Sequence, residues 1–254
     1  MSNLKWGWLA LIAGLLLQVA HGDDRTPLET VKNDYRSFYA KERLLRLGIG
    51  FGLGAIAANT SMDQDFQEWY QDHVRGSGTD DFADAAKNLG EGKYLIPLSL
   101  LASGLGVIDE GSPIGAWGTH TLRSYLTGGP ALLLMQRATG GSRPGERKDA
   151  SHWRPFRDNN GVSGHAFIGA VPFLTVARMH PGGPVAWGAY LASAAAAWSR
   201  INDDAHFLSQ AALGWYMAWE SVDAVFDADE KPKAFSLAPL LLDDGYGVAA
   251  RFTW

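Results

Sequence analysis

The sequence contains no cysteine among its 254 residues. This absence excludes disulfide bonds, thiol catalysis, cysteine-ligated zinc and a bacterial lipid anchor attached to cysteine. An excess of basic charge is also missing, because 22 lysine and arginine residues face 27 aspartate and glutamate residues. The net charge of −5 gives no global positive field, so nucleic acid is not expected as a partner and any anion site must be local.

Strongly apolar runs are missing beyond the N-terminus. The two stretches with fewest charges, Asn159–Ala177 and Met179–Ser199, contain several proline, glycine and serine residues. They lack the leucine, isoleucine, valine and phenylalanine content of segments that insert strongly into membranes. The chain has 30 glycine and 10 tryptophan residues, which favours closely packed helices with large aromatic side chains. We therefore expect buried helices of a soluble or peripherally membrane-attached domain.

The first 22 residues have the pattern of an export signal. Lys5 is the basic start, Trp6–Leu17 is the apolar core, and Ala20–Gly22 supplies small residues before a cleavage site at Asp23. The core has about twelve residues, fewer than the ~20 that a membrane-spanning helix needs, so a single membrane anchor is the weaker alternative. Export of a chain without cysteine indicates a periplasmic protein.

Helical patterns occupy residues 23–234, and the last residues differ. Apolar periodicity and capping residues predict helices at 31–59, 62–73, 79–89, 94–107, 114–126, 130–138, 163–178, 184–198 and 207–226. Residues 235–254 contain Asp243-Asp244-Gly245 between two apolar runs, the second of which alternates, and this pattern predicts a β-hairpin. The sequence thus predicts an all-α domain followed by a short C-terminal β-hairpin.

Two segments offer groups that suit an anion. Ser163 and Gly164 open a predicted helix, whose free backbone N–H groups and dipole favour negative charge. His165 lies in the first turn and can exchange a proton near neutral pH. Arg143 and Arg200, the second at the end of another predicted helix, carry planar guanidinium groups that match phosphate oxygens.

A third segment adds a candidate nucleophile. Arg200 ends one predicted helix and His206 opens the next, and Asn202-Asp203-Asp204 between them can cap the second helix. His206 and Gln210 lie one helical turn apart, so the amide can hydrogen-bond the imidazole. A fixed cation beside an oriented imidazole is what phosphoryl transfer to histidine requires. Each segment alone also fits a simple helix cap or a structural pair.

In order and spacing, these segments resemble the motifs of the type 2 phosphatidic acid phosphatase superfamily, which includes bacterial non-specific acid phosphatases and vanadium haloperoxidases. That family carries Lys, six residues and Arg-Pro; then Pro-Ser-Gly-His; then Ser-Arg, five residues, His, three residues and Asp. Arg143-Pro144, Ser163-Gly164-His165 and Ser199-Arg200 with His206 match in this order. The resemblance covers residues 132–214.

The resemblance implies a helical bundle with the site at one end of its central helices. It also implies hydrolysis of a phosphate ester or lipid pyrophosphate without a metal or another cofactor. His206 would attack phosphorus and form a phosphohistidine, while His165 would protonate the leaving oxygen and then activate water. Gln210 would orient His206. The groups that would hold the phosphate oxygens are Arg143, Ser163, Gly164 and Arg200.

Three positions depart from the family pattern. The lysine position holds Gln136; Arg137 follows it and is a candidate replacement, although one step along a helix turns a side chain by about 100°. Val162 replaces proline, which only shapes the turn. The aspartate position holds Gln210, whose amide oxygen can accept from the imidazole but stabilises positive charge less than a carboxylate does.

These departures leave alternatives open. A second alignment of the first motif uses Arg154-Pro155 with Lys148, which keeps a lysine but is one residue short. A haloperoxidase would bond vanadate to His206 in the same pocket. A non-catalytic envelope protein on a degraded site is favoured by Gln136 and Gln210. The expected partners are a phosphorylated small molecule or lipid and a membrane surface.

Overall fold

The computed structural model describes residues 26–230, 235–242 and 245–252; the expected export signal at 1–22 lies outside these residues. Residues 26–230 form α-helices, one short 3-10 helix and their connections, which confirms the all-α prediction. Two strands follow, β1 (Phe235–Leu242) and β2 (Gly245–Phe252). They pair antiparallel, with Phe235 opposite Phe252 and Leu242 opposite Gly245.

The N-terminal half of the bundle consists of α2 (Pro27–Phe38), α3 (Lys41–Asn59), α4 (Met62–His73), α5 (Ser77–Ala86), η1 (Lys87–Gly90) and α6 (Gly92–Ile108). The expectation of one helix over 31–59 is wrong, because the chain is extended at Ala40 and a new helix begins there. At this break the carbonyl of Ser37, in the last turn of α2, accepts from the N–H of Ala40 and from Nε of Arg43, both at 3.2 Å.

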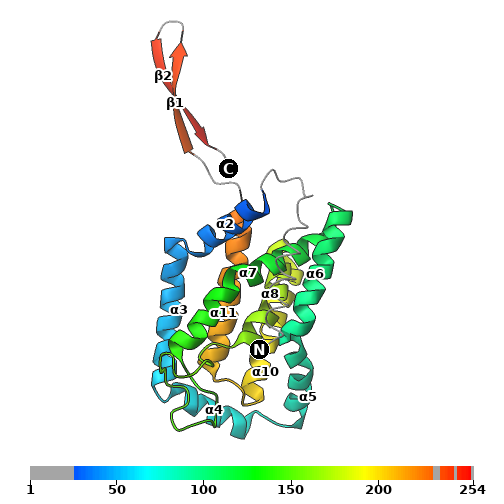
Figure 1. Ribbon diagram of the computed structural model, residues 1–254, viewed down its shortest axis with the longest axis vertical. Helices are drawn as coiled ribbons and strands as arrows, with labels where there is room; N and C mark the ends of the chain where they lie inside the picture. Colours follow the sequence, from blue (N-terminus) through cyan, green and yellow to red (C-terminus); the bar gives the residue numbers. More distant parts are fainter. Residues whose placement is uncertain (1–25, 231–234, 243–244, 253–254) are drawn as a thin grey trace.

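The C-terminal half consists of α7 (Pro113–Thr139), α8 (Gly164–Met179), α9 (Gly183–Ser193), α10 (Ala195–Asn202) and α11 (Leu208–Asp229). Helices α7, α8 and α11 pack against one another in the middle of the molecule. Figure 1 shows α3 on one side of this centre and α6 on the other. The buried centre includes Leu132 of α7, Phe167 and Leu174 of α8, and Met217 of α11.

Pro130 of α7 and Pro172 of α8, like Pro97 of α6, lie inside helices. We expected separate helices at 114–126 and 130–138, but α7 is continuous through Pro130, and α8 likewise continues through Pro172. An internal proline removes one backbone hydrogen bond and leaves the carbonyl four residues earlier without its partner. Tyrosine hydroxyls from neighbouring helices replace both missing donors. Tyr35 donates to the carbonyl of Leu126 at 3.0 Å, and Tyr125 donates to the carbonyl of Ile168 at 2.8 Å.

The expected helix over 184–198 is divided at Ala194 into α9 and α10. Ser193 lies at this point. Its hydroxyl donates to the carbonyl of Tyr190 at 2.6 Å and accepts from the indole N–H of Trp215 at 2.8 Å. A serine that bonds back to its own helix bends the helix, and here an indole of α11 holds that serine in place.

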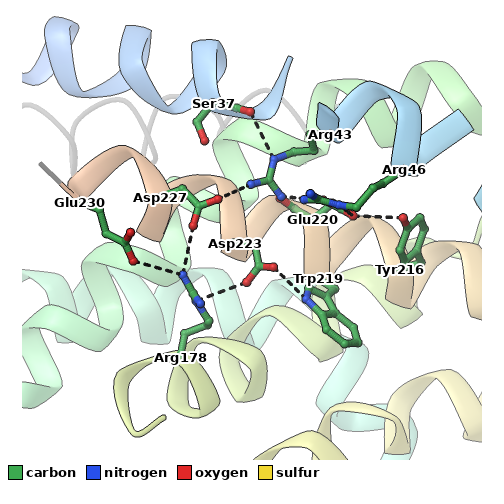
Figure 2. A network of polar contacts seen from close by, with 10 residues as sticks. All are labelled: Ser37, Arg43, Arg46, Arg178, Tyr216, Trp219, Glu220, Asp223, Asp227 and Glu230. Carbon is green, nitrogen blue, oxygen red and sulfur yellow. Dashed lines mark hydrogen bonds and ion pairs between the residues drawn. The ribbon is translucent and has the colours of Figure 1, made fainter. Parts of the chain in front are cut away.

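One end of the bundle is joined by a network of ion pairs (Figure 2). Glu220 of α11 is 3% exposed and accepts hydrogen bonds from Arg43 at 2.6 Å and from Arg46 at 2.7 Å. Arg178 of α8 contacts Asp227 of α11 at 3.2 Å. Burial raises the pKa of Glu220, but the hydrogen bond from Arg46 and the charge of Arg43 bring it below its usual value. The carboxylate is therefore ionised and fixes α3 to α11.

The outer helices expose apolar side chains. Those on α3 include Leu45, Ile49, Leu53 and Ile56, and those on α6 include Leu98, Leu101, Leu105 and Ile108. The spacings of three and four residues place each group along one face of its helix. Among the described residues, no helix is both long enough and apolar enough to cross a membrane.

Candidate active site

The candidate site lies at the bundle end opposite the ion-pair network, where α7 and α10 end and α8 and α11 begin (Figure 1). The connection from Gly140 to Ser163 covers this end. Gly140 ends α7 with a φ of 64°, and a Cβ there would lie 1.9 Å from the carbonyl oxygen of Arg154. Only glycine tolerates both conditions. The N–H of Phe156 also donates to the carbonyl of Arg137 at 2.7 Å, so the covering loop is tied to α7.

His206 is held by Gln210, as their spacing predicted. His206 is 5% exposed, and its Nδ1 lies 2.9 Å from Oε1 of Gln210. The same oxygen accepts the N–H of Phe207 at 3.2 Å, while Nε2 of Gln210 donates to the carbonyl of Ser142 at 2.8 Å. The contact to Ser142 identifies which end of the amide is the donor. Nδ1 of His206 must therefore carry the hydrogen, and its Nε2 keeps a free lone pair.

Burial lowers the pKa of His206 to about 4. The hydrogen bond to Gln210 opposes this change, whereas the nearby charges of Arg143, Arg200 and His165 lower the pKa further. The imidazole is consequently neutral at pH 7. Arg143, Arg200 and His165, all expected around the phosphate, thus lie close enough to His206 to affect its pKa.

Arg200 presents a buried donor beside this imidazole. Its carbonyl accepts the N–H of His206 at 3.0 Å, and its guanidinium forms an ion pair with Asp203. Nε of Arg200 is buried and has no hydrogen-bond partner among the described residues. A buried guanidinium N–H without a partner is costly, so this donor is suited to an anion that the protein binds. Arg143 is exposed, and its Nε donates to Oδ1 of Asn160 at 3.0 Å.

The start of α8 is attached to α11. The N–H of Ser163 donates to the carbonyl of Gln210 at 2.9 Å, and its hydroxyl accepts the N–H of Ala166 at 3.3 Å. A Cβ at Gly214 would lie 2.3 Å from the carbonyl oxygen of Ser163, so glycine permits this approach. Gly164 is the first residue of α8, where backbone N–H groups have no partner within the helix.

His165 has a partner that the sequence did not reveal. Its Nε2 lies 3.3 Å from Oε1 of Glu91, the residue that precedes α6. The hydrogen bond from His165 lowers the pKa of Glu91, so this carboxylate is ionised and can orient the imidazole. Glu91 is 74 residues from His165 in the chain and stands between two glycines that indicated only a helix break. No spacing signal could have paired these two residues.

The first motif is only partly assembled. Gln136, at the lysine position of the family, donates from Nε2 to the carbonyl of Val162 at 2.9 Å and so braces the turn before α8. Arg137 is exposed, and no hydrogen bond or ion pair of its guanidinium is found within the described residues. Its role in phosphate binding stays a prediction. The charge of Arg143 lowers the pKa of His206, which agrees with the first of the two alignments.

The expected cap of the last helix is wrong. Asp203 pairs with Arg200 and Asp204 accepts from Gln67 at 2.7 Å, so neither carboxylate caps α11. Asp63 of α4 does so instead, because its Oδ1 accepts the N–H of Ser209 at 3.0 Å. Burial raises the pKa of Asp63, while its hydrogen bonds from Ser209 oppose this change. The cap of α11 therefore comes from a carboxylate of a distant helix and not from the carboxylates nearest in sequence.

A metal centre has no obvious donor set in the described part of the chain, since no group of three histidine, aspartate or glutamate side chains is arranged to hold an ion. Comparisons with models of known protein families, with curated proteins and with solved structures find no match for this chain.

Proposed function

We propose that this chain is a phosphatase built on a bundle of the type 2 phosphatidic acid phosphatase kind, with a short C-terminal β-hairpin. It would hydrolyse a phosphate ester or a lipid pyrophosphate through a phosphohistidine. The observation that carries this proposal is the state of His206: a neutral imidazole whose Nδ1–H is bound by Gln210 at 2.9 Å, which leaves Nε2 as a nucleophile.

In the first step, the lone pair of His206 Nε2 attacks phosphorus and the bond from phosphorus to the leaving oxygen breaks. His165 gives its proton to that oxygen, so an alcohol or a phosphate leaves. Arg143 and Arg200 supply positive charge for the equatorial oxygens, and Nε of Arg200 is a buried donor that awaits an acceptor. The proposal gives Ser163 a capping role and assigns the free N–H groups at Gly164 to the phosphate.

In the second step, His165 takes a proton from water, and the oxygen of that water attacks the phosphorus of the phosphohistidine. The bond from phosphorus to nitrogen breaks and inorganic phosphate is released, which restores the neutral imidazole. Glu91 supports His165 in its protonated form, which exists before the first step and again after the second. Gln210 keeps His206 oriented but offers only an amide dipole to the cationic phosphoimidazole, so turnover should be slower than with a carboxylate.

A membrane surface is a proposed partner of the same enzyme. The exposed apolar side chains of α3 and α6 form surfaces suited to contact with lipid. The protein should therefore sediment with phospholipid vesicles. A variant with Leu45, Leu53, Leu98 and Leu101 changed to Ser should remain in the supernatant while keeping activity on a soluble phosphomonoester.

The deciding experiment measures phosphate release. Purified protein is assayed with phosphomonoesters, phosphatidic acid, phosphatidylglycerol phosphate, polyprenyl pyrophosphate and lipid A phosphates. His206→Ala should be inactive on every substrate that the parent hydrolyses, whereas His152→Ala, a matched change on the covering loop, should retain turnover. Quenching in alkaline denaturant during turnover should trap a phosphate on the parent protein that is stable to base and released by acid. Equal turnover by the parent and His206→Ala would refute the proposal, and halide oxidation with added vanadate would favour a haloperoxidase.

A further inference from the structure

A cavity lined by arginines lies next to the candidate reaction site. Its volume is about 430 Å³, and its lining residues are Gly140, Ser142, Arg147, Arg154, Arg157 and Asp158. The cavity shares Ser142 with the reaction site, because the carbonyl of Ser142 accepts from Gln210, which in turn binds His206. Two hydrogen bonds therefore connect the wall of this arginine cavity to the nucleophile.

The charges around the arginine cavity are not balanced. Arg154 and Arg157 are exposed, and within the described residues neither guanidinium has a hydrogen bond or an ion pair. The lining carboxylate, Asp158, accepts instead from the hydroxyl of Ser142 at 2.7 Å and from Nδ2 of Asn160 at 3.0 Å. Three guanidinium groups thus face one carboxylate, in a chain whose net charge is −5. Such a local excess attracts a small anion.

Arg147 is held in the cavity wall by oxygens of the covering loop. Its Nε donates to the hydroxyl of Ser142 at 2.8 Å, and its Nη1 donates to the carbonyl of Asp149 at 2.8 Å. Burial lowers the pKa of Arg147 and the nearby charge of Arg154 lowers it further, while the charges of Asp158, Asp149 and Glu146 oppose these changes. Two like charges held near each other repel, and a bound oxyanion between them would relieve this repulsion.

Backbone hydrogen bonds fix the chain around the arginine cavity. Ser142 N–H donates to the carbonyl of Ala150 at 2.9 Å, and Phe156 N–H donates to the carbonyl of Arg137 at 2.7 Å. Gly140 allows the chain at Arg154 to pass directly over the end of α7. A loop held by such contacts loses little conformational entropy when it binds a ligand.

We propose that the arginine cavity is a second oxyanion site, separate from the phosphate position at His206, which binds a phosphate-sized acidic group through Arg147, Arg154 and Arg157. Planar guanidinium groups match such oxygens, and Ser142 couples the occupied cavity to Gln210. The oxyanion is either a second acidic group of the substrate or free phosphate. The first source rests on the proposed function and specifies a substrate with two separated acidic groups.

Binding of inorganic phosphate tests the site independently of catalysis. Isothermal titration of the parent protein should resolve two phosphate sites. Arg154→Gln/Arg157→Gln, which alters only exposed side chains, should lose one of them. Lys148→Gln removes an exposed cation of the same loop that does not line the cavity, so it should keep both sites. Identical phosphate binding by the parent and the double variant would overturn the proposal, whether or not the protein is a phosphatase.

Kinetics then identify the source of the oxyanion. If the substrate supplies it, the parent should prefer a bisphosphate ester to the matching monophosphate ester, and the double variant should lose about tenfold or more of that preference in kcat/KM. Turnover of the monophosphate ester should stay unchanged. If free phosphate is the ligand, the double variant should lose phosphate binding and keep the parent's preference. Unchanged turnover in His206→Ala, together with loss of one phosphate site in the double variant, would refute the proposed function and still support the arginine cavity.

Discussion

Acid should destabilise this protein through His206, and the size of the effect follows from its burial. The pKa of His206 is about 4 in the folded protein, compared with 6.5 for an ordinary histidine. Between these values the unfolded chain binds a proton that the folded chain does not. The contribution of neutral His206 to the free energy of unfolding is therefore fully present above pH 6.5 and is lost as the pH falls toward 4. The loss amounts to about 3 kcal/mol, since each pH unit corresponds to about 1.4 kcal/mol.

His206→Asn isolates this effect. The asparagine amide nitrogen can take the place of imidazole Nδ1 and donate to Gln210, but it does not titrate. Urea unfolding of both proteins, followed by circular dichroism between pH 8 and pH 4, gives the difference in free energy of unfolding. That difference should shift by about 3 kcal/mol in favour of the variant, or roughly 6–12 °C in Tm. Other titrating groups are common to both proteins and cancel.

Above pH 7.5 the two stability curves should run parallel, which controls for any change in packing caused by the substitution. A difference that stays constant from pH 8 to pH 4 would refute the reasoning. It would mean that His206 is solvated well enough to accept a proton without cost. The proposed neutral nucleophile would then lose its main physical support.

Three further outcomes are expected. Activity should survive EDTA, because no metal donor set is found in the described residues, and loss of turnover restored by a divalent ion would contradict this. Vanadate should inhibit competitively as a mimic of the five-coordinate transition state at His206; indifference to millimolar-range vanadate would count against a histidine nucleophile. Gln210→Ala removes three hydrogen bonds and should lower the free energy of unfolding by about 3 kcal/mol in urea titrations. Gln210→Asp keeps a group that can accept from His206 but loses the contact to Ser142, and it should be at least as active as the parent. Lower turnover by Gln210→Asp would contradict the expected gain from a carboxylate.

Contacts among the proposed reacting residues were predictable where they are local in sequence. The spacing of His206 and Gln210 predicted their hydrogen bond, and the opening of a helix at Ser163 predicted a cap there. Glu91 and Asp63 were not predictable as partners, because each contacts its histidine or helix from a distant part of the chain. The spacing of residues in a single sequence does not indicate which carboxylate of another helix will contact the start of a given helix.

The predicted helix boundaries were wrong where tertiary contacts override local sequence signals. Pro130 was expected to separate two helices, and it does not, because the hydroxyl of Tyr35 replaces the missing backbone donor at Leu126. Conversely, the run over 184–198 has no strong breaker at its centre, yet the chain bends where Trp215 holds Ser193. In both cases a side chain from another helix determines the backbone conformation, and propensity alone could not predict it.

The attachment of α11 at both ends has a consequence for local opening. Asp63 holds its first turn, while Arg43 and Arg178 hold its last turns. Amide hydrogens in such a helix exchange with solvent only when much of the bundle opens together. In contrast, α9 exposes large apolar side chains and should exchange, and be cut by proteases, far earlier. Opening of the periphery would therefore leave His206 and Gln210 in register, and the reacting pair should be among the last parts of the molecule to lose its structure.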